Sequence, residues 1–356
     1  MPEFTLVDDP ASLESTLQEL AIVAVDTEFM REKTFFSQLC LVQLAAADHI
    51  YCVDPLDREL SSFWDSALTV PWVLHSGRQD IEVVYQAAGR MPVSVFDTQV
   101  AAGLLGYPAQ MGYATLVNEL FGVEIDKSHT RADWSRRPLP EAYLHYAAED
   151  VEYLLPAYEM LAERLETQSR LAWAEEDSAL LLDPALYDID PATAIDRLKG
   201  ARNLRGKRRA AAVRLAEWRE TEALRANRPR QWIARDAVLI DLAARLPQHL
   251  GDLENVDGLS AGLVRRSGRK ILAAIATSLE DGNHYAPPRA PNEAQKSLLK
   301  SMQQKVATCA AELGIAAETV ASKRDLSAVV LGGDRDSRVL SGWRRELIGE
   351  ELLALL

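Results

Sequence analysis

The texture of the sequence changes near residue 190, and this change constrains the fold more than any other feature of the chain. Before it, short apolar runs alternate with segments whose apolar residues recur at helical spacing. The runs that predict strands are Ile22–Val25, Leu39–Ala45, Ile50–Val53, Trp72–Leu74 and Val93–Phe96. The segments that predict helices between them are Ala11–Leu20, Asp80–Ala88, Thr98–Leu105 and Tyr113–Phe121. This alternation predicts an α/β domain built on a largely buried mixed sheet.

The rest of the chain is predicted to be helical. Leu139–Leu165 has helical spacing, and Pro156 is expected to kink or divide it. Beyond residue 190 the helical stretches are Leu198–Leu224, Ala234–Leu246, Leu259–Leu279 and Glu293–Leu313. The proline-rich segment His284–Pro291 is typical of a linker. We therefore expect three domains, comprising residues 1–195, 205–285 and 291–356.

Charge is distributed unevenly along the chain. The net charge is −14, which by itself argues against a nucleic-acid partner. Residues 1–196, however, carry 11 Lys/Arg against 34 Asp/Glu, whereas residues 197–230 carry 12 Lys/Arg against 3 acids. An acidic body followed by a basic strip indicates a candidate phosphate-contacting surface, with a solvated linker as the alternative.

Hydropathy and cysteine content exclude two other classes of protein. No apolar run is long enough for a transmembrane helix, and the acidic N-terminus lacks the pattern of a secretion signal. The three cysteines form no CxxC pair and are typical of small buried residues in a reducing compartment. We expect a cytoplasmic protein.

Asp26 and Glu28 end the first predicted strand, in the stretch AIVAVDTEF. Residues i and i+2 of a strand project from the same face, so two carboxylates would lie side by side at the edge of a hydrophobic sheet. Ionised neighbours there require a cation or must take up protons. Ligands that offer only oxygen favour Mg²⁺ or Mn²⁺ over zinc.

Three further residues share this chemistry. Asp80 begins a predicted helix, where it is either a helix cap or a ligand. Tyr146 and Asp150 lie four residues apart on one face of another predicted helix. Local spacing alone does not distinguish Tyr146 from Tyr143 or Tyr153.

The order of these residues, D-x-E, then D, then Y-x-x-x-D, resembles the DEDD exonuclease superfamily in its tyrosine (DEDDy) branch. The stretches VDTEFMREKTFFSQLCLVQLA, VFDTQVAAGLLGY, LVNELFGVEIDKSHTRADWSRRPL and YAAEDVEYLLPAY are similar to ribonuclease D. The stretch LAEWRETEALRANRPRQWIARDAVLIDLAARLP, followed by LENVDGL, resembles an HRDC domain, and ribonuclease D carries two such modules. The second, from about Asn292 onward, shows the pattern poorly, although its ending SGWRRELIGEELLALL also resembles ribonuclease D.

The resemblance implies a ribonuclease H-like fold and hydrolysis of the terminal phosphodiester with release of nucleoside 5′-monophosphates. It implies two divalent metal ions, Mg²⁺ or Mn²⁺, held by Asp26, Glu28, Asp80 and Asp150, with Asp26 bridging. Tyr146 would orient the attacking water, because a phenol with an ordinary pKa of about 10 is a poor base. The implied partner is RNA, with tRNA precursors as the family's expected substrate.

Substrate contacts are predicted from positive charge and aromatic character. The candidates are Lys127, Arg131, Trp134, Arg136 and Arg137 before the last motif, and Arg202, Arg205, Lys207, Arg208 and Arg209 in the basic strip. Trp134 is equally compatible with a place in the core. A DNA-directed exonuclease and a non-catalytic nucleic-acid-binding protein remain alternatives, because the residues alone do not decide recognition of the 2′-hydroxyl. The six histidines show no spacing typical of a zinc site.

Overall fold

The structure is a computed structural model that describes residues 2–46, 49–125, 129, 132–280 and 290–356. By contacts the chain divides into two compact units. Unit 1 comprises Met1–Met30, Leu39–Tyr187 and Ala290–Leu356, and unit 2 comprises Arg31–Gln38 and Asp188–Arg289. Within the described residues, no helix combines the length and the apolar character that crossing a membrane requires.

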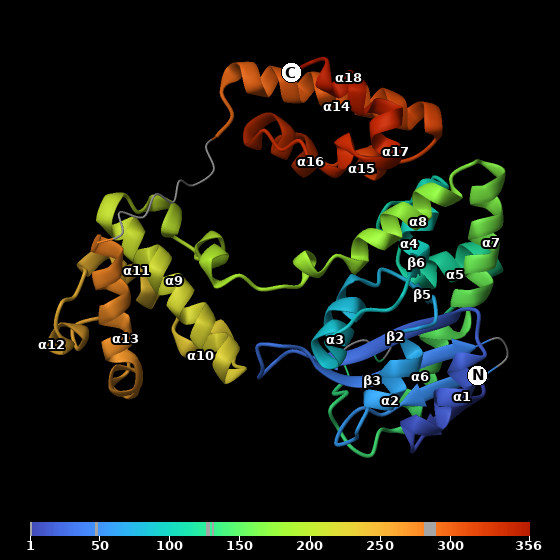
Figure 1. The fold of residues 1–356 in the computed structure, drawn as a ribbon, viewed down its shortest axis with the longest axis horizontal. Helices are drawn as coiled ribbons and strands as arrows, with labels where there is room; N and C mark the ends of the chain where they lie inside the picture. The colour runs from blue at the N-terminus through green and yellow to red at the C-terminus, as the bar shows by residue number, and fades with distance from the viewer. Residues whose placement is uncertain (1, 47–48, 126–128, 130–131, 281–289) are drawn as a thin grey trace. The chain divides into compact units, whose positions relative to one another are not determined.

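A six-stranded mixed sheet forms the centre of unit 1 (Figure 1). In sheet order, the strands are β1 (Phe4–Val7), β4 (His49–Val53), β3 (Gln38–Ala46), β2 (Val23–Met30), β5 (Trp72–Leu74) and β6 (Val95–Asp97). Strands β1 and β4, β2 and β5, and β5 and β6 pair in parallel, whereas β3 and β4 are antiparallel. The mixed sheet predicted from the sequence is therefore confirmed. The edge strand β1 was not predicted, because only Val7 of its four residues is buried.

Helices cover both faces of this sheet. They are α1 (Glu14–Gln18), α2 (Ser61–Ala67), α3 (Arg78–Ala88), α4 (Thr98–Leu104), α5 (Tyr113–Phe121), α6 (Glu141–Glu152), α7 (Leu154–Thr167) and α8 (Leu171–Ala179). Alternate residues of a strand face opposite cores. Trp72 accordingly packs in a cluster with Ile81 of α3, and its neighbour Val73 packs in another with Ala148 and Val151 of α6.

The predicted division of the helical region before residue 167 is confirmed. Helix α6 ends at Glu152, with Tyr153 as its C-cap, and α7 begins at Leu154. Pro156 lies in the first turn of α7, where its missing N–H leaves no intrahelical hydrogen bond unmade.

Over residues 188–280, unit 2 is helical apart from short connecting turns. Its helices are α9 (Gly206–Ala226), α10 (Arg230–Ile233), α11 (Asp236–Arg245), α12 (Leu250–Leu253) and α13 (Ala261–Glu280). Their apolar faces form one buried cluster that includes Ile195, Leu215, Leu239 and Ile271. The sequence predicted a helix from Leu198, but the chain forms short 3₁₀ turns (Pro191–Arg197 and Ala201–Asn203) and α9 begins only at Gly206. Part of the predicted linker, residues 284–289, lies outside the described residues.

The segment Arg31–Gln38, which connects β2 to β3, belongs to unit 2. Asn227, the left-handed residue that ends α9, accepts hydrogen bonds on its side-chain oxygen from the N–H groups of Phe35 and Phe36, both at 3.0 Å. The Arg230 guanidinium lies over the Phe35 ring, 4.4 Å from its centroid. The same guanidinium is held by the buried carboxylate of Glu220 at 2.5 and 2.6 Å.

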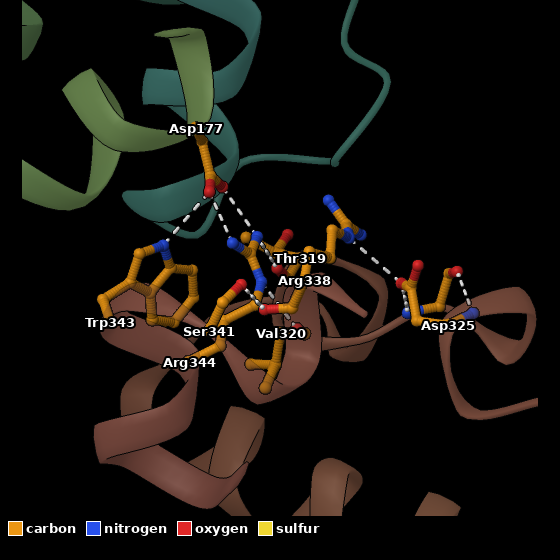
Figure 2. Close-up of polar contacts among 9 residues, drawn as sticks. Asp177, Thr319, Val320, Asp325, Arg338, Ser341, Trp343 and Arg344 are labelled. Atoms are coloured by element: carbon orange, nitrogen blue, oxygen red, sulfur yellow. Dashed lines mark hydrogen bonds and ion pairs between the residues drawn. The ribbon is translucent and has the colours of Figure 1, made fainter. Parts of the chain in front are cut away.

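The C-terminal part of unit 1 is a second helical module with its own buried cluster. It contains α14 (Glu293–Leu313), α15 (Ala317–Val320), α16 (Lys323–Ser327), α17 (Gly342–Arg344) and α18 (Glu350–Leu353). Figure 2 shows how α17 contacts α8: Arg344 forms a two-pronged ion pair with Asp177, to which Trp343 also donates its indole N–H. The Trp343 ring also stacks on that of Trp173, with centroids 4.4 Å apart and the planes 7° from parallel.

Candidate active site

Strand β2 carries Asp26 and Glu28 in the part toward Met30, where fewer of its residues are buried. Val23, Val25 and Thr27 are buried, and the two valines pack in the cluster that also contains residues of α3. By strand alternation, Ala24, Asp26 and Glu28 project from the other face, on which Ala24 packs against α6. The side-by-side arrangement of Asp26 and Glu28 predicted from the sequence is present.

Helix α6 brings a third carboxylate to this face. Its Ala148 and Val151 pack beside Ala24, and this contact directs Asp150 toward the end of β2. One carboxylate oxygen from each of Asp26, Glu28 and Asp150 lies within 4.8 Å of the others, and all three residues are partly buried. We call these three residues the acid cluster.

Asp80 lies beside the acid cluster but is not one of the three grouped carboxylates. It occupies the first turn of α3, whose N-cap is Gly77, and its carboxylate accepts hydrogen bonds from its own backbone N–H and from that of Thr27. Its carboxylate accepts a hydrogen bond of 2.5 Å from the Thr27 hydroxyl and is 8% exposed. Its charge is the largest electrostatic contribution to the raised pKa of Asp26, after burial.

Thr27 is a functional candidate that the sequence reasoning did not single out. It lies between Asp26 and Glu28 but faces the opposite side of β2, where it holds the Asp80 side chain. Strand periodicity places it opposite to the two acids, but only the packing of α3 against this face reveals Asp80 as its partner.

Tyr146 donates its hydroxyl hydrogen to Asp150, one turn later on α6, and this bond lowers the pKa of Asp150 against the effect of burial. The Tyr143 and Tyr146 rings both pack near Trp134, at 5.3 and 6.1 Å, but Tyr146 is the one that bonds Asp150. The Tyr153 ring packs against Phe121 at 5.6 Å, and the Tyr153 N–H donates to the Tyr113 hydroxyl at 3.0 Å. The Tyr113 hydroxyl in turn donates to the Glu149 carbonyl at 3.2 Å.

The acid cluster and Asp80 share a raised proton affinity. Burial raises the pKa of Glu28 to about 9, that of Asp150 to about 7 and that of Asp80 to about 6. Burial, followed by the charges of Asp80, Asp150 and Glu28, raises the pKa of Asp26 well above its ordinary value. Among the residues that the structure describes, burial and neighbouring carboxylates are the main causes that raise these pKa values, and no lysine or arginine is a main cause that lowers them.

This donor set fits a divalent cation. The acid cluster offers only carboxylate oxygens, which hard cations such as Mg²⁺ and Mn²⁺ prefer. A bound cation would offset the mutual repulsion that raises the pKa values of the four acids.

Two other polar residues near α3, Asp97 and His75, have structural roles. Asp97 caps α4, since its carboxylate accepts the Gln99 N–H at 2.8 Å, and it also accepts the N–H groups of Ser76 and Gly77. His75 is hydrogen-bonded through its two ring nitrogens to the Thr98 hydroxyl and the Met111 carbonyl, each at 2.9 Å.

The substrate-contact candidates before α6 have different environments. Trp134 is 2% exposed and packs in the core, which contradicts its stacking on a base. Arg137 is held by Asp54 at 2.6 and 2.7 Å and by the carbonyls of Cys40, Trp134 and Arg136, so its guanidinium is occupied within the protein. Arg136 is exposed, whereas Lys127 and Arg131 lie outside the described residues.

The basic strip is also divided between two roles. Arg205 donates to the carbonyls of Arg202 and Leu204, and Arg209 donates to that of Leu204, so both side chains stabilise the turn before α9. Arg202, Lys207 and Arg208 are exposed.

Comparison with known families agrees with this geometry. Residues 4–166 match the 3′-5′ exonuclease family model, and residues 208–275 match that of the HRDC domain. The crystal structure of Escherichia coli RNase D, described as an exoribonuclease involved in structured RNA processing, superposes with a TM-score of 0.88. It is 30% identical in sequence, and the alignment covers 99% of this chain and 98% of that one. The catalytic core of RRP6 from Trypanosoma brucei, at a TM-score of 0.62 and 22% identity over 80% of this chain and 81% of that one, shares the fold.

Curated relatives cover the whole length of the chain. Ribonuclease D of Granulibacter bethesdensis is 41% identical over 99% of this chain and 93% of its own. Ribonuclease D of Gluconacetobacter diazotrophicus is 40% identical over 99% of this chain and 91% of its own. These relatives confirm the resemblance and the expected fold of an exonuclease domain followed by a helical HRDC region. The chain belongs to the ribonuclease D family and is a 3′→5′ exoribonuclease.

Proposed function

We propose that Asp26, Glu28, Asp80 and Asp150 are the ligands of two divalent metal ions, Mg²⁺ or Mn²⁺, and that Tyr146 positions the attacking water. The observation that supports this assignment most strongly is the convergence of three carboxylates from β2 and α6 within 4.8 Å. Asp80 completes the set from the other side of β2, with one of its oxygens bonded to Thr27.

The proposed roles are divided between the bound cations and the Tyr146 side chain. When bound, the cations would supply Lewis-acid stabilisation of the attacking and leaving oxygens. The Tyr146 hydroxyl uses its hydrogen in the bond to Asp150, which leaves its oxygen as an acceptor for a water hydrogen. This arrangement supports orientation of the water by Tyr146.

The substrate that we propose is an RNA with a single-stranded 3′ end, with tRNA precursors as the specific case, cleaved to nucleoside 5′-monophosphates. The exposed Arg136, Arg202, Lys207 and Arg208 are proposed phosphate contacts. We also propose that the functional domains are residues 1–195, an HRDC domain of residues 205–285 and a second HRDC-like module of residues 291–356.

End-labelled tRNA precursor and a DNA of matched sequence, each incubated with Mg²⁺, Mn²⁺ or EDTA, test the substrate and metal assignments together. Stepwise loss of 3′ nucleotides from the RNA only, abolished by EDTA, is expected. Cleavage that persists in EDTA contradicts the metal assignment, and equal trimming of both polymers contradicts specificity for RNA.

Substitutions on α6 test the residue roles. Asp150→Asn is expected to abolish turnover while the fold is retained, and Tyr146→Phe is expected to slow single-turnover cleavage by about 10²-fold or more. The matched control is Glu141→Gln, an exposed acid at the start of the same helix. Normal single-turnover rates in either of the first two variants contradict the corresponding role.

A further inference from the structure

A cavity in unit 2 has no role in the function described so far. It has a volume of about 460 Å³ and lies between the end of α9, α10 and the first half of α13. Its lining includes Glu222, Arg225, Arg228, Trp232, Arg266 and Lys270. None of these residues is among the substrate contacts predicted from the sequence.

Trp232 is the aromatic residue at this cavity. Its side chain is 57% exposed, whereas Trp218 of the same unit is 9% exposed and packs in the core. Among the described residues, no aromatic ring packs against Trp232. A largely exposed indole offers a flat apolar face on which a nucleic-acid base can stack.

The charge around Trp232 is positive. Glu222 is the one acid of the lining, and it bonds Lys270 at 2.5 Å and Arg225 at 2.9 Å. Arg228 and Arg266 are exposed and form no ion pair with any residue that the structure describes. Two guanidinium groups of the lining are therefore available for phosphates.

The cavity is also structurally anchored. Asn227, between the lining residues Ala226 and Arg228, holds the backbone of Phe35 and Phe36. These two residues belong to the segment that follows β2, the strand that carries Asp26 and Glu28. The turn between α9 and α10, which precedes Trp232, is therefore hydrogen-bonded to that segment.

We propose that this cavity binds a single-stranded segment of the RNA substrate, with a base stacked on Trp232 and neighbouring phosphates on Arg228 and Arg266. The proposal rests on the RNA substrate of the proposed function and assigns one place where that RNA is held. Single-stranded RNA fits better than an acidic peptide, because the cavity pairs an exposed indole with separate cations.

Binding of a fluorescently labelled RNA of about twelve nucleotides, a length within the usual site sizes, tests the proposal on the full chain in EDTA, where no cleavage occurs. Trp232→Ala is expected to weaken binding about ten-fold, and Trp232→Phe is expected to retain most of the affinity. Arg228→Gln and Arg266→Gln are each expected to reduce the slope of log K against log[salt] by roughly 0.7. The matched control is Arg269→Gln, an exposed arginine of α13 that does not line the cavity.

Hydrolysis of a dinucleotide, which lacks the single-stranded segment proposed to occupy the cavity, separates this proposal from the proposed function. With Mn²⁺ present, wild type and Trp232→Ala are expected to cleave it at equal rates, whereas the longer RNA shows a raised KM in the variant. Unchanged affinity of Trp232→Ala for the longer RNA overturns the cavity assignment, even where cleavage is normal. Preferential binding of a polyglutamate peptide that depends on Trp232 also overturns it.

Discussion

Asp26 lies where the charges of three other carboxylates meet, and its raised pKa is a property of the whole group. Without a cation, the folded protein keeps protons on these acids that the unfolded chain releases above about pH 4. Because the unfolded chain then binds fewer protons than the folded one, the free energy of unfolding decreases as pH rises. This decrease continues through the pKa of Asp150 at about 7 and toward that of Glu28 at about 9.

The first prediction follows from this proton linkage. Without metal, in EDTA, the Tm is expected to be lower at pH 8 than at pH 6. With Mn²⁺ in place of EDTA, the Tm is expected to increase more at pH 8, where fewer protons compete for the ligands. Asp150→Asn should show a smaller fall in Tm between the two pH values. Differential scanning calorimetry measures the Tm at both pH values. If the Tm falls by the same amount in wild type and Asp150→Asn, the raised pKa of Asp150 is contradicted.

Thr27 supplies the second prediction. Removal of its hydroxyl by Thr27→Val releases Asp80 without changing a proposed ligand, so Mn²⁺ binding is expected to weaken about ten-fold or more, as for other partners of metal ligands. Thr27→Ser keeps the hydroxyl and should bind Mn²⁺ nearly as the wild type does. Isothermal titration calorimetry without substrate measures this affinity independently of turnover.

Thr69→Val is the matched control for Thr27→Val. It removes a hydroxyl that is bonded at 2.7 Å to the carbonyl of Ser66 in the same domain. If Thr27→Val and Thr69→Val bind Mn²⁺ equally well, the bond to Asp80 is a strand–helix contact without influence on the metal site.

At the scale of helices and strands, prediction from sequence succeeded where the pattern is local. Strand β5 and helices α5 and α14 have the predicted ends, because each is a continuous apolar or helical pattern bounded by turn residues. The five proposed catalytic residues were identified from the family motif, which local spacing alone did not provide. The contact between α8 and α17 was not predicted, because Asp177 and Arg344 are separated by 167 residues of sequence.

The third prediction concerns this contact between α8 and α17. The side chains of Asp177 and Arg344 are 8% and 2% exposed, and Arg344 also donates to the carbonyls of Thr319 and Val320 (Figure 2). Arg344→Met leaves the Asp177 carboxylate buried without its charged partner, so the free energy of unfolding is expected to fall by about 3–5 kcal/mol. Urea denaturation of the full chain measures this change.

The neighbouring Arg345 provides the control. It pairs with Glu350, but both side chains are more than half exposed, so Arg345→Met is expected to cost about 1 kcal/mol or less. Equal losses in the two variants would mean that burial of the ion pair between Asp177 and Arg344 has no energetic consequence.

For the whole molecule, the question is how a chain with a net charge of −14 binds a polyanion. Most of the excess acid lies in residues 1–196, where proposed metal binding offsets part of it, and the excess base lies in residues 197–230. The sequence could locate this strip, but it could not show that Arg205 and Arg209 are bonded to backbone carbonyls. Of the five candidate contacts that the sequence indicates near the start of α9, the exposed Arg202, Lys207 and Arg208 are therefore the ones that can contact phosphate.

The last prediction is that combined substitution of Arg202, Lys207 and Arg208 by glutamine reduces the salt slope of RNA binding by roughly 2, because each phosphate contact to a single strand contributes about 0.7. Glutamine at Lys300, Lys323 and Arg335, three exposed positions of the C-terminal module, removes the same charge and should leave the slope nearly unchanged. The binding constant of the full chain for labelled RNA, measured over a range of salt concentrations in EDTA, compares the two. Because both variants have the same net charge, a difference in slope shows that the position of the charges matters. Equal slopes would mean that RNA responds only to the total charge and that the strip is a solvated linker.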